Sequence, residues 1–162
     1  MKLTFDVPEG MAEKIAEDIK VALEEYKKKQ IWPQEGDKYY HLGYDGNVTW
    51  DRYNDDFVDK NRFRLGNMFK TKEEAEFKLE QLRVLHELGQ LADDDKIDAY
   101  KNYHYMLIYD FDKSAVKICD IVCANFMYGT HYFKSKESAQ AAINKIGEDR
   151  LKKYYFCIPE EE

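Results

Sequence analysis

The pattern of apolar and polar residues predicts a long amphipathic helix near the start of the chain. From about Glu9 to Gln30, apolar residues recur at every third or fourth position, which places them on one face of a helix. These residues are Met11, Ile15, Ile19, Ala22, Leu23 and Tyr26. Pro33 and Gly36 then end the pattern, because both residue types interrupt regular structure.

The rest of the chain reads as two copies of a strand–strand–strand–helix unit. Strand-like stretches are expected at residues 38–43, 48–53 and 62–69 in the first unit and at 103–109, 115–123 and 128–133 in the second. The Asp45-Gly46 pair favours a tight hairpin turn between the first two strands. Helical spacing returns after each third strand and ends near Gly89 and Gly147.

A short motif that occurs twice supports this duplication. Residues 69–75 read Phe-Lys-Thr-Lys-Glu-Glu-Ala, and residues 133–139 read Phe-Lys-Ser-Lys-Glu-Ser-Ala. Thr71 and Ser135 are residue types that favour the N-cap of a helix, and Glu74 completes a capping box in the first copy. We therefore expect both motifs to start helices at equivalent points of two similar units.

Together these patterns predict an α+β fold, with an N-terminal helix followed by two repeated units of about three antiparallel strands plus a helix. The expected segments are the N-terminal amphipathic helix at 1–31, a first sheet–helix repeat at 32–92, an acidic connector at 93–102 and a second sheet–helix repeat at 103–162. A short helical turn is expected at 97–100, a further turn at 148–153 and a final extended segment at 154–158.

Composition and charge narrow the classes of partner. The chain has 162 residues, an aromatic content of 15% and a net charge of −7. This charge argues against general nucleic-acid or membrane binding and would attract basic partners. A local basic face near Arg52, Arg62 and Arg64 still leaves room for single-stranded nucleic acid stacked on strand aromatics. No apolar run suggests a membrane span or a signal peptide, so a cytoplasmic location is expected.

The thiols and histidines do not form a recognisable chemical motif. Cys119 and Cys123 would share one face of a strand, but the other candidate ligands lack metal-site spacing, so buried structural thiols are expected. His86 lies on the apolar stripe of a predicted helix and is expected to be a packing residue. His41, His104 and His131 lie in Tyr-rich strands, where a general base is conceivable but no nucleophile motif accompanies them. The sequence also lacks a Gly-rich phosphate loop. We therefore expect a non-enzymatic protein without a metal or another cofactor.

Two acidic clusters offer surface chemistry. Asp55, Asp56 and Asp59 fall in a predicted loop, and Asp93, Asp94 and Asp95 fall in the connector. Neither cluster alternates with small polar residues as calcium loops do, so each is either solvated loop charge or a docking surface for a basic protein. Trp32, Tyr44 and Trp50 are the candidate aromatic anchors beside the first cluster, although core packing is the alternative for at least one tryptophan.

Several stretches also resemble a family of uncharacterised phage and prophage proteins of low-GC Gram-positive bacteria. The resemblance covers about residues 32–158. It rests on Trp32-Pro33 followed by Gly36-Asp37-x-Tyr39-Tyr40, on Gly46-Asn47-Val48 with Trp50, and on Gly66-Asn67-Met68-Phe69-Lys70-Thr71-Lys72-Glu73-Glu74-Ala75-Glu76. The closing stretch from Ile146 to Phe156 is also similar to that family. The resemblance implies a small accessory protein of a mobile element and transfers no reaction.

The leading hypothesis is therefore a phage- or prophage-encoded interaction protein that binds a host protein with a basic surface. Such a partner would be a defence or nucleic-acid-handling factor, inhibited in an anti-CRISPR-like manner or similarly. Two alternatives stay open: a small-ligand or nucleotide-binding module, and a binder of single-stranded nucleic acid. The oligomeric state is left open by the sequence.

Overall fold

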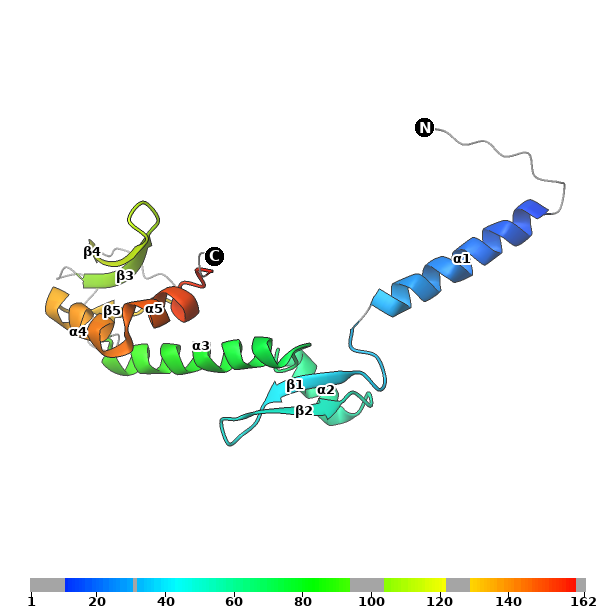
Figure 1. Ribbon diagram of the computed structural model, residues 1–162, viewed down its shortest axis with the longest axis horizontal. Helices are drawn as coiled ribbons and strands as arrows, with labels where there is room; N and C mark the ends of the chain where they lie inside the picture. The colour runs from blue at the N-terminus through cyan, green and yellow to red at the C-terminus, as the bar shows by residue number, and fades with distance from the viewer. Residues whose placement is uncertain (1–10, 31, 94–103, 122–128, 160–162) are drawn as a thin grey trace. The chain divides into compact units, whose positions relative to one another are not determined.

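The computed structural model describes residues 11–30, 32–93, 104–121 and 129–159, and it confirms the α+β class (Figure 1). The helices are α1 (Met11–Gln30), α2 (Phe57–Arg64), α3 (Lys72–Leu91), α4 (Lys136–Ile146) and α5 (Glu148–Arg150), followed by a π-helical turn at Leu151–Tyr155. The strands are β1 (Lys38–Leu42), β2 (Val48–Arg52), β3 (His104–Asp110), β4 (Ala115–Ile121) and β5 (Tyr132–Phe133).

The chain divides into two compact units that differ in what they contain. The first comprises residues 1–41 and 49–70, and therefore holds α1, most of the β1–β2 hairpin and α2. The second comprises residues 42–48 and 71–162, and therefore holds the hairpin turn, α3 and all later elements. The predicted N-terminal helix is confirmed over its described residues, 11–30.

The repeat is visible in how the strands pair. In the second unit the strand order is β4-β3-β5, and Tyr105 of β3 pairs with Phe133 of β5. In the first, β1 pairs with β2, and Tyr40 of β1 forms an isolated antiparallel bridge with Phe69. Each hairpin's first strand thus pairs with the phenylalanine that opens the repeated motif, as the duplication predicts.

Both predicted N-caps are confirmed. The Thr71 hydroxyl accepts a hydrogen bond of 3.1 Å from the Glu74 backbone N–H, and the Glu74 side chain completes the capping box at the start of α3. The Ser135 hydroxyl accepts the same 3.1 Å bond from the Ser138 N–H at the start of α4. Ser138 supplies the reciprocal contact that Glu74 makes in the first copy, so the two motifs begin their helices in the same way.

The predicted acidic loop at 54–60 and third strand at 62–69 are wrong, because α2 occupies residues 57–64. Asp56 is the N-cap of α2, and its side chain accepts a 2.9 Å bond from the Asp59 N–H. Only Phe69 remains of the expected strand, as the bridge to Tyr40. The Asp56-Phe57-Val58-Asp59 pattern of an N-cap with a carboxylate three residues later was the signal for this helix.

Other boundaries also differ from the sequence expectation. Strand β5 contains two residues, and the π-helical turn at Leu151–Tyr155 takes up the first two residues of the extended segment expected at 154–158. The predicted turn at 97–100 lies outside the described residues. Asp93, assigned to the acidic connector, is buried, and its carboxylate accepts a bond from the Lys134 N–H at 3.3 Å.

The hydrophobic core of the second unit forms where α3 and α4 cover the three-stranded sheet. Its buried members include Val84 and Leu88 of α3, Leu107 of β3, Phe133 of β5 and Ile143 of α4. The buried residues of α3 are Ala75, Val84 and Leu88, so the apolar face predicted for this helix is only partly correct. His86, expected to pack, is exposed along with Leu82 and Leu85.

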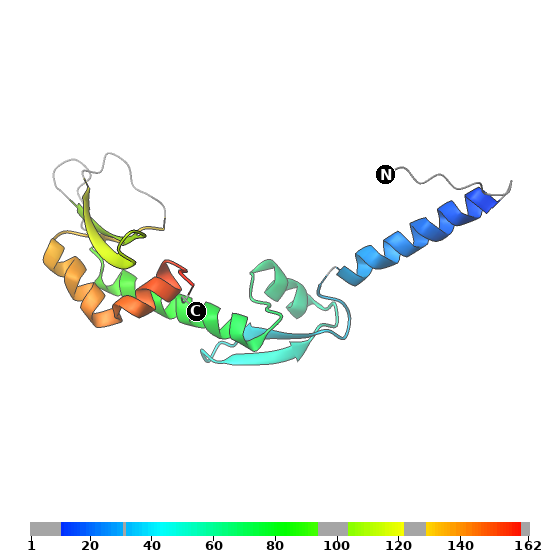
Figure 2. The same cartoon turned by 45° about the horizontal axis from the view of Figure 1, so that its top comes forward.

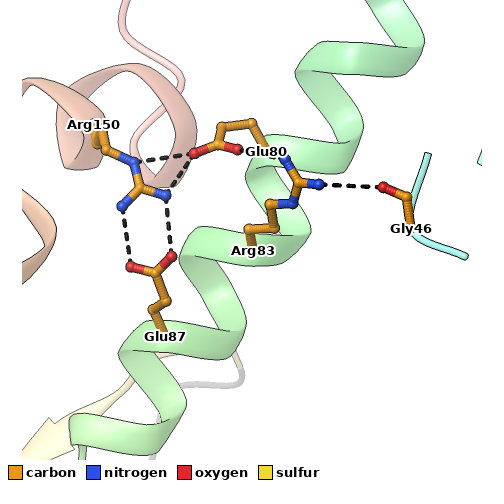
Figure 3. Close-up of polar contacts among 5 residues, drawn as sticks. All are labelled: Gly46, Glu80, Arg83, Glu87 and Arg150. Carbon is orange, nitrogen blue, oxygen red and sulfur yellow. Dashed lines mark hydrogen bonds and ion pairs between the residues drawn. The ribbon is translucent and has the colours of Figure 1, made fainter. Parts of the chain in front are cut away.

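Within the second unit, Arg150 of α5 connects α5 to α3 (Figure 3). Arg150 contacts both Glu80 and Glu87, which lie about two helical turns apart on α3, with bonds of 2.5 to 3.1 Å. Arg83, on the same helix, donates to the Gly46 carbonyl of the hairpin turn at 3.2 Å. The Arg150 guanidinium holds the pKa of the Glu87 carboxyl below its usual range.

Replacing Arg150 with methionine should lower the free energy of unfolding of the second unit by about 1–2 kcal/mol, because two charge-assisted contacts are lost from a partly exposed site. The Glu87 part of this stabilisation should be present at neutral pH and should fade as the pH falls through its lowered folded-state pKa. Chemical denaturation at pH 7 and at acid pH measures both effects. Arg83→Met is the matched control and should cost less, since its side chain is more exposed. Equal losses at the two pH values would contradict the assignment.

Candidate interaction surfaces

The interior of the first unit is built largely from polar side chains. Among its described residues, the buried ones are Tyr39, His41, Asp59 and Met68. The Tyr39 hydroxyl donates to the Asp59 carboxylate at 2.6 Å and accepts from Arg62 at 2.5 Å. Arg62 also donates to Asp51 of β2 at 2.9 Å. These bonds hold α2 against one face of the hairpin. Figure 2 shows α2 beside the two strands.

The network has clear electrostatic consequences. Burial, followed by the hydrogen bond to Asp59, raises the pKa of Tyr39 to about 12. The hydrogen bond from Arg62 lowers the pKa of Asp51. Asp59 also accepts a 2.7 Å bond from the Asn54 N–H, so its carboxylate fixes the chain just before α2 as well as the tyrosine beneath it. These groups are occupied with one another, which favours a structural role over a catalytic one.

The outward side of α2 carries two exposed phenylalanines among polar residues. Phe57 is 78% exposed and Phe63 is 54% exposed. Phe57, Asn61 and Arg64 recur at helical spacing on the side opposite Asp59 and Arg62. A shallow depression of about 380 Å³ lies on this side. It is lined by Tyr53, Phe57, Lys60, Asn61, Phe63 and Arg64, which we call the α2 face.

The other face of the hairpin combines aromatic rings with cations. Strand alternation places Tyr39 and His41 on the α2 side and Lys38 and Tyr40 on the opposite side, in agreement with their burial. In β2, Asp51 contacts Arg62 of α2, so Trp50 and Arg52 lie on the side away from α2. We call Lys38, Tyr40, Trp50 and Arg52 the open hairpin face.

The residues of the open hairpin face contact one another. The Lys38 ammonium lies 4.7 Å from the ring centre of Tyr40 and 4.9 Å from that of Trp50. Arg52 donates to the Gly36 carbonyl at 3.2 Å. The two aromatic rings are therefore held beside fixed positive charge.

The predicted acidic docking loop is not a cluster of free surface charges. Asp59 is 2% exposed, within α2, and its buried position contradicts its place in an exposed loop. The Asp56 carboxylate caps α2. Asp55 remains exposed, where it pairs with Lys60 at 3.0 Å and accepts a bond from Tyr53 at 2.8 Å, and these contacts lower its pKa.

The three predicted aromatic anchors lie in different surroundings. Tyr44, in the hairpin turn, is fully exposed, and Trp50 is 54% exposed on the open hairpin face. Trp32 is half-buried, and the Lys70 ammonium lies 5.6 Å from its ring centre. Phe57 and Phe63 are also exposed but were not among the predicted anchors. The sequence signal that could have found them is the capping pattern at Asp56, because it indicates a helix over this segment, and in that helix both phenylalanines are exposed.

The cysteines and histidines that were considered as reactive groups or metal ligands differ in exposure. Cys119, expected to be buried, is half-buried, Cys157 is exposed, and Cys123 lies outside the described residues. His41 and His104 are buried, and His131 is half-buried beside Tyr155. In the part of the chain that the structure describes, no group of three or more His, Cys, Asp or Glu side chains is arranged to hold a metal ion. No helix within the described ranges is both long and apolar enough to cross a membrane.

Comparisons with protein-family models, curated proteins and solved structures find no match to this chain.

Proposed function

We propose that this chain is a non-enzymatic interaction protein, encoded by a phage or prophage, that binds a host protein through the α2 face. The observation that carries the proposal is the exposure of Phe57 and Phe63 around a shallow depression. Aromatic side chains in such positions are the residues that supply most of the binding energy at protein interfaces. In the free protein these exposed rings contribute little to the stability of the fold.

The position of α2 supports this use. The helix is held by buried polar contacts from Asp59 and Arg62 to Tyr39, so its apolar side chains are not needed to attach it. A partner can therefore cover Phe57 and Phe63 without competing with the fold. The rigid attachment also lowers the entropy lost on binding, because the rings are presented from a helix with a fixed N-cap.

The partner that we propose is a host defence or nucleic-acid-handling factor with a basic surface, which the protein inhibits. The net charge of −7 would attract such a partner over long range and raise the association rate. We assign most of the binding free energy of the complex to Phe57 and Phe63. Asp55 contributes to attraction at most, while Asp56 and Asp59 serve α2 itself.

The test is a measured affinity for a partner isolated from host lysate. Phe57→Ala and Phe63→Ala should each weaken binding roughly 30-fold if each ring is a hot spot worth about 2 kcal/mol. Phe111→Ala is the matched control, since Phe111 has the same 78% exposure in the second unit. Circular dichroism would check that all variants fold. Unchanged affinity in both α2 variants would reject the α2 face as the binding surface.

A charge variant separates attraction from contact. Asp55→Lys should slow association at low salt and leave dissociation nearly unchanged, because an exposed charge acts mainly through long-range attraction. Simultaneous reversal of Asp55, Asp56 and Asp59 would be uninformative, since two of the three carboxylates hold α2 in place.

A further inference from the structure

We propose that the open hairpin face binds single-stranded nucleic acid, with bases stacked on Trp50 and Tyr40 and phosphates paired with Lys38 and Arg52. This site is on the side of the hairpin away from the α2 face, so the inference goes beyond the proposed function and does not depend on it. The occupant is identified by two kinds of group that occur together: aromatic rings and cations.

The rings are available for stacking. Trp50 is 54% exposed and Tyr40 is half-buried, and both side chains project from neighbouring strands on the same face. Any base can stack on such rings, because every base has a π-face, and this mode of binding is common to sheet surfaces that bind single strands. A duplex keeps its bases stacked internally, so the rings favour a single strand.

The charges on this face are complementary to phosphate. The four residues of the open hairpin face carry two positive charges and no carboxylate, whereas Asp51 projects to the α2 side and pairs with Arg62. Residues 32–70 hold six basic and seven acidic residues, so most of the net charge of −7 lies elsewhere in the chain. The acidic composition that argues against general nucleic-acid binding therefore does not describe this face.

Lys38 connects the two kinds of group. Its ammonium lies within 5 Å of both ring centres, at 4.7 and 4.9 Å. A base that stacks on Trp50 would displace the ammonium from that ring and bring its own phosphate close to Lys38. The ion–ring contact would then be exchanged for an ion pair and a stacked base. An acidic peptide could pair with the cations but would leave the rings uncovered, so single-stranded nucleic acid is the better fit.

The experiment uses the full chain and a fluorescently labelled oligothymidylate at low salt. Anisotropy should show binding that Trp50→Ala weakens about tenfold, the effect expected for one stacked base. Lys38→Gln and Arg52→Gln should each reduce the slope of log affinity against log salt by about 0.7, the value for one phosphate contact on a single strand. Phe57→Ala should bind the oligonucleotide normally, which keeps this test separate from that of the α2 face.

Tryptophan fluorescence locates the site, because the chain has only two tryptophans. The oligonucleotide should quench emission in the natural chain and in Trp32→Phe, but not in Trp50→Phe. Absence of binding at low salt, or quenching that survives in Trp50→Phe, would overturn the proposal. Preference for a duplex of equal length would also overturn it, as would preference for a polyglutamate peptide, which would indicate an acidic protein as the occupant. Thermal melts would confirm that each variant is folded.

Discussion

Replacing Phe133 with alanine should lower the free energy of unfolding of the second unit by about 3–5 kcal/mol, the range for a buried phenylalanine. Phe133 is 0% exposed and packs in the core with Leu88, Leu107 and Ile143. Its position in β5 makes it the strand partner of Tyr105 as well. The loss would therefore combine the transfer of a large ring with the cavity left behind.

Denaturant unfolding followed by far-ultraviolet circular dichroism measures this loss. Phe69→Ala is the matched control, because Phe69 occupies the equivalent place in the first copy of the motif but is only half-buried. It should cost clearly less than Phe133→Ala. A Phe133 variant as stable as the natural chain would show that this core is not formed as described.

Replacing Asp59 with alanine should destabilise the first unit by about 2–4 kcal/mol. The Asp59 carboxylate accepts bonds from the Tyr39 hydroxyl and the Asn54 N–H. Without it, both donors lose their acceptor in or near a buried site, and each unsatisfied donor costs about 1–3 kcal/mol. The loss would be offset in part by removing a buried charge. Local unfolding of the hairpin and α2 can be followed by hydrogen exchange in residues 38–70.

Asp55→Ala is the control for this prediction. Asp55 belongs to the same acidic cluster in the sequence, but its carboxylate is exposed, so solvent screens its ion pair with Lys60 and the substitution should change stability little. If the two substitutions have equal small effects, Asp59 is a surface charge and the polar interior described above is incorrect.

The sequence predicts much of the fold where apolar residues face inward. The hairpins, both N-caps and the repeated pairing before each capped helix all follow from apolar spacing or from short-range cap chemistry. These signals are local, so they do not require knowledge of what packs against them. The same reasoning explains why the ends of α3 and α4 could be placed within a few residues.

Helix α2 could not be predicted from apolar spacing because its pattern is reversed. Its one buried residue is Asp59, the half-buried Arg62 points to the same side, and its phenylalanines are exposed. A prediction from periodicity places apolar residues inside and charged residues outside. It therefore put Asp59 in an exposed loop and Phe63 in a strand. Only the cap pattern at Asp56 indicated a helix. Trp50, named as a candidate anchor, is exposed, and its neighbours Lys38 and Tyr40 come from the adjacent strand, so they could be grouped with it only once the hairpin was known.

The polar interior of the first unit also sets how temperature acts on the chain. Burial of apolar surface is the source of the large heat capacity of unfolding, and its stabilising effect weakens on cooling. Among the described residues of the first unit, only Tyr39 and Met68 are buried apolar side chains, whereas the second unit has a full apolar core. The free energy of unfolding of the second unit therefore curves strongly with temperature. That of the first unit changes with a much smaller curvature.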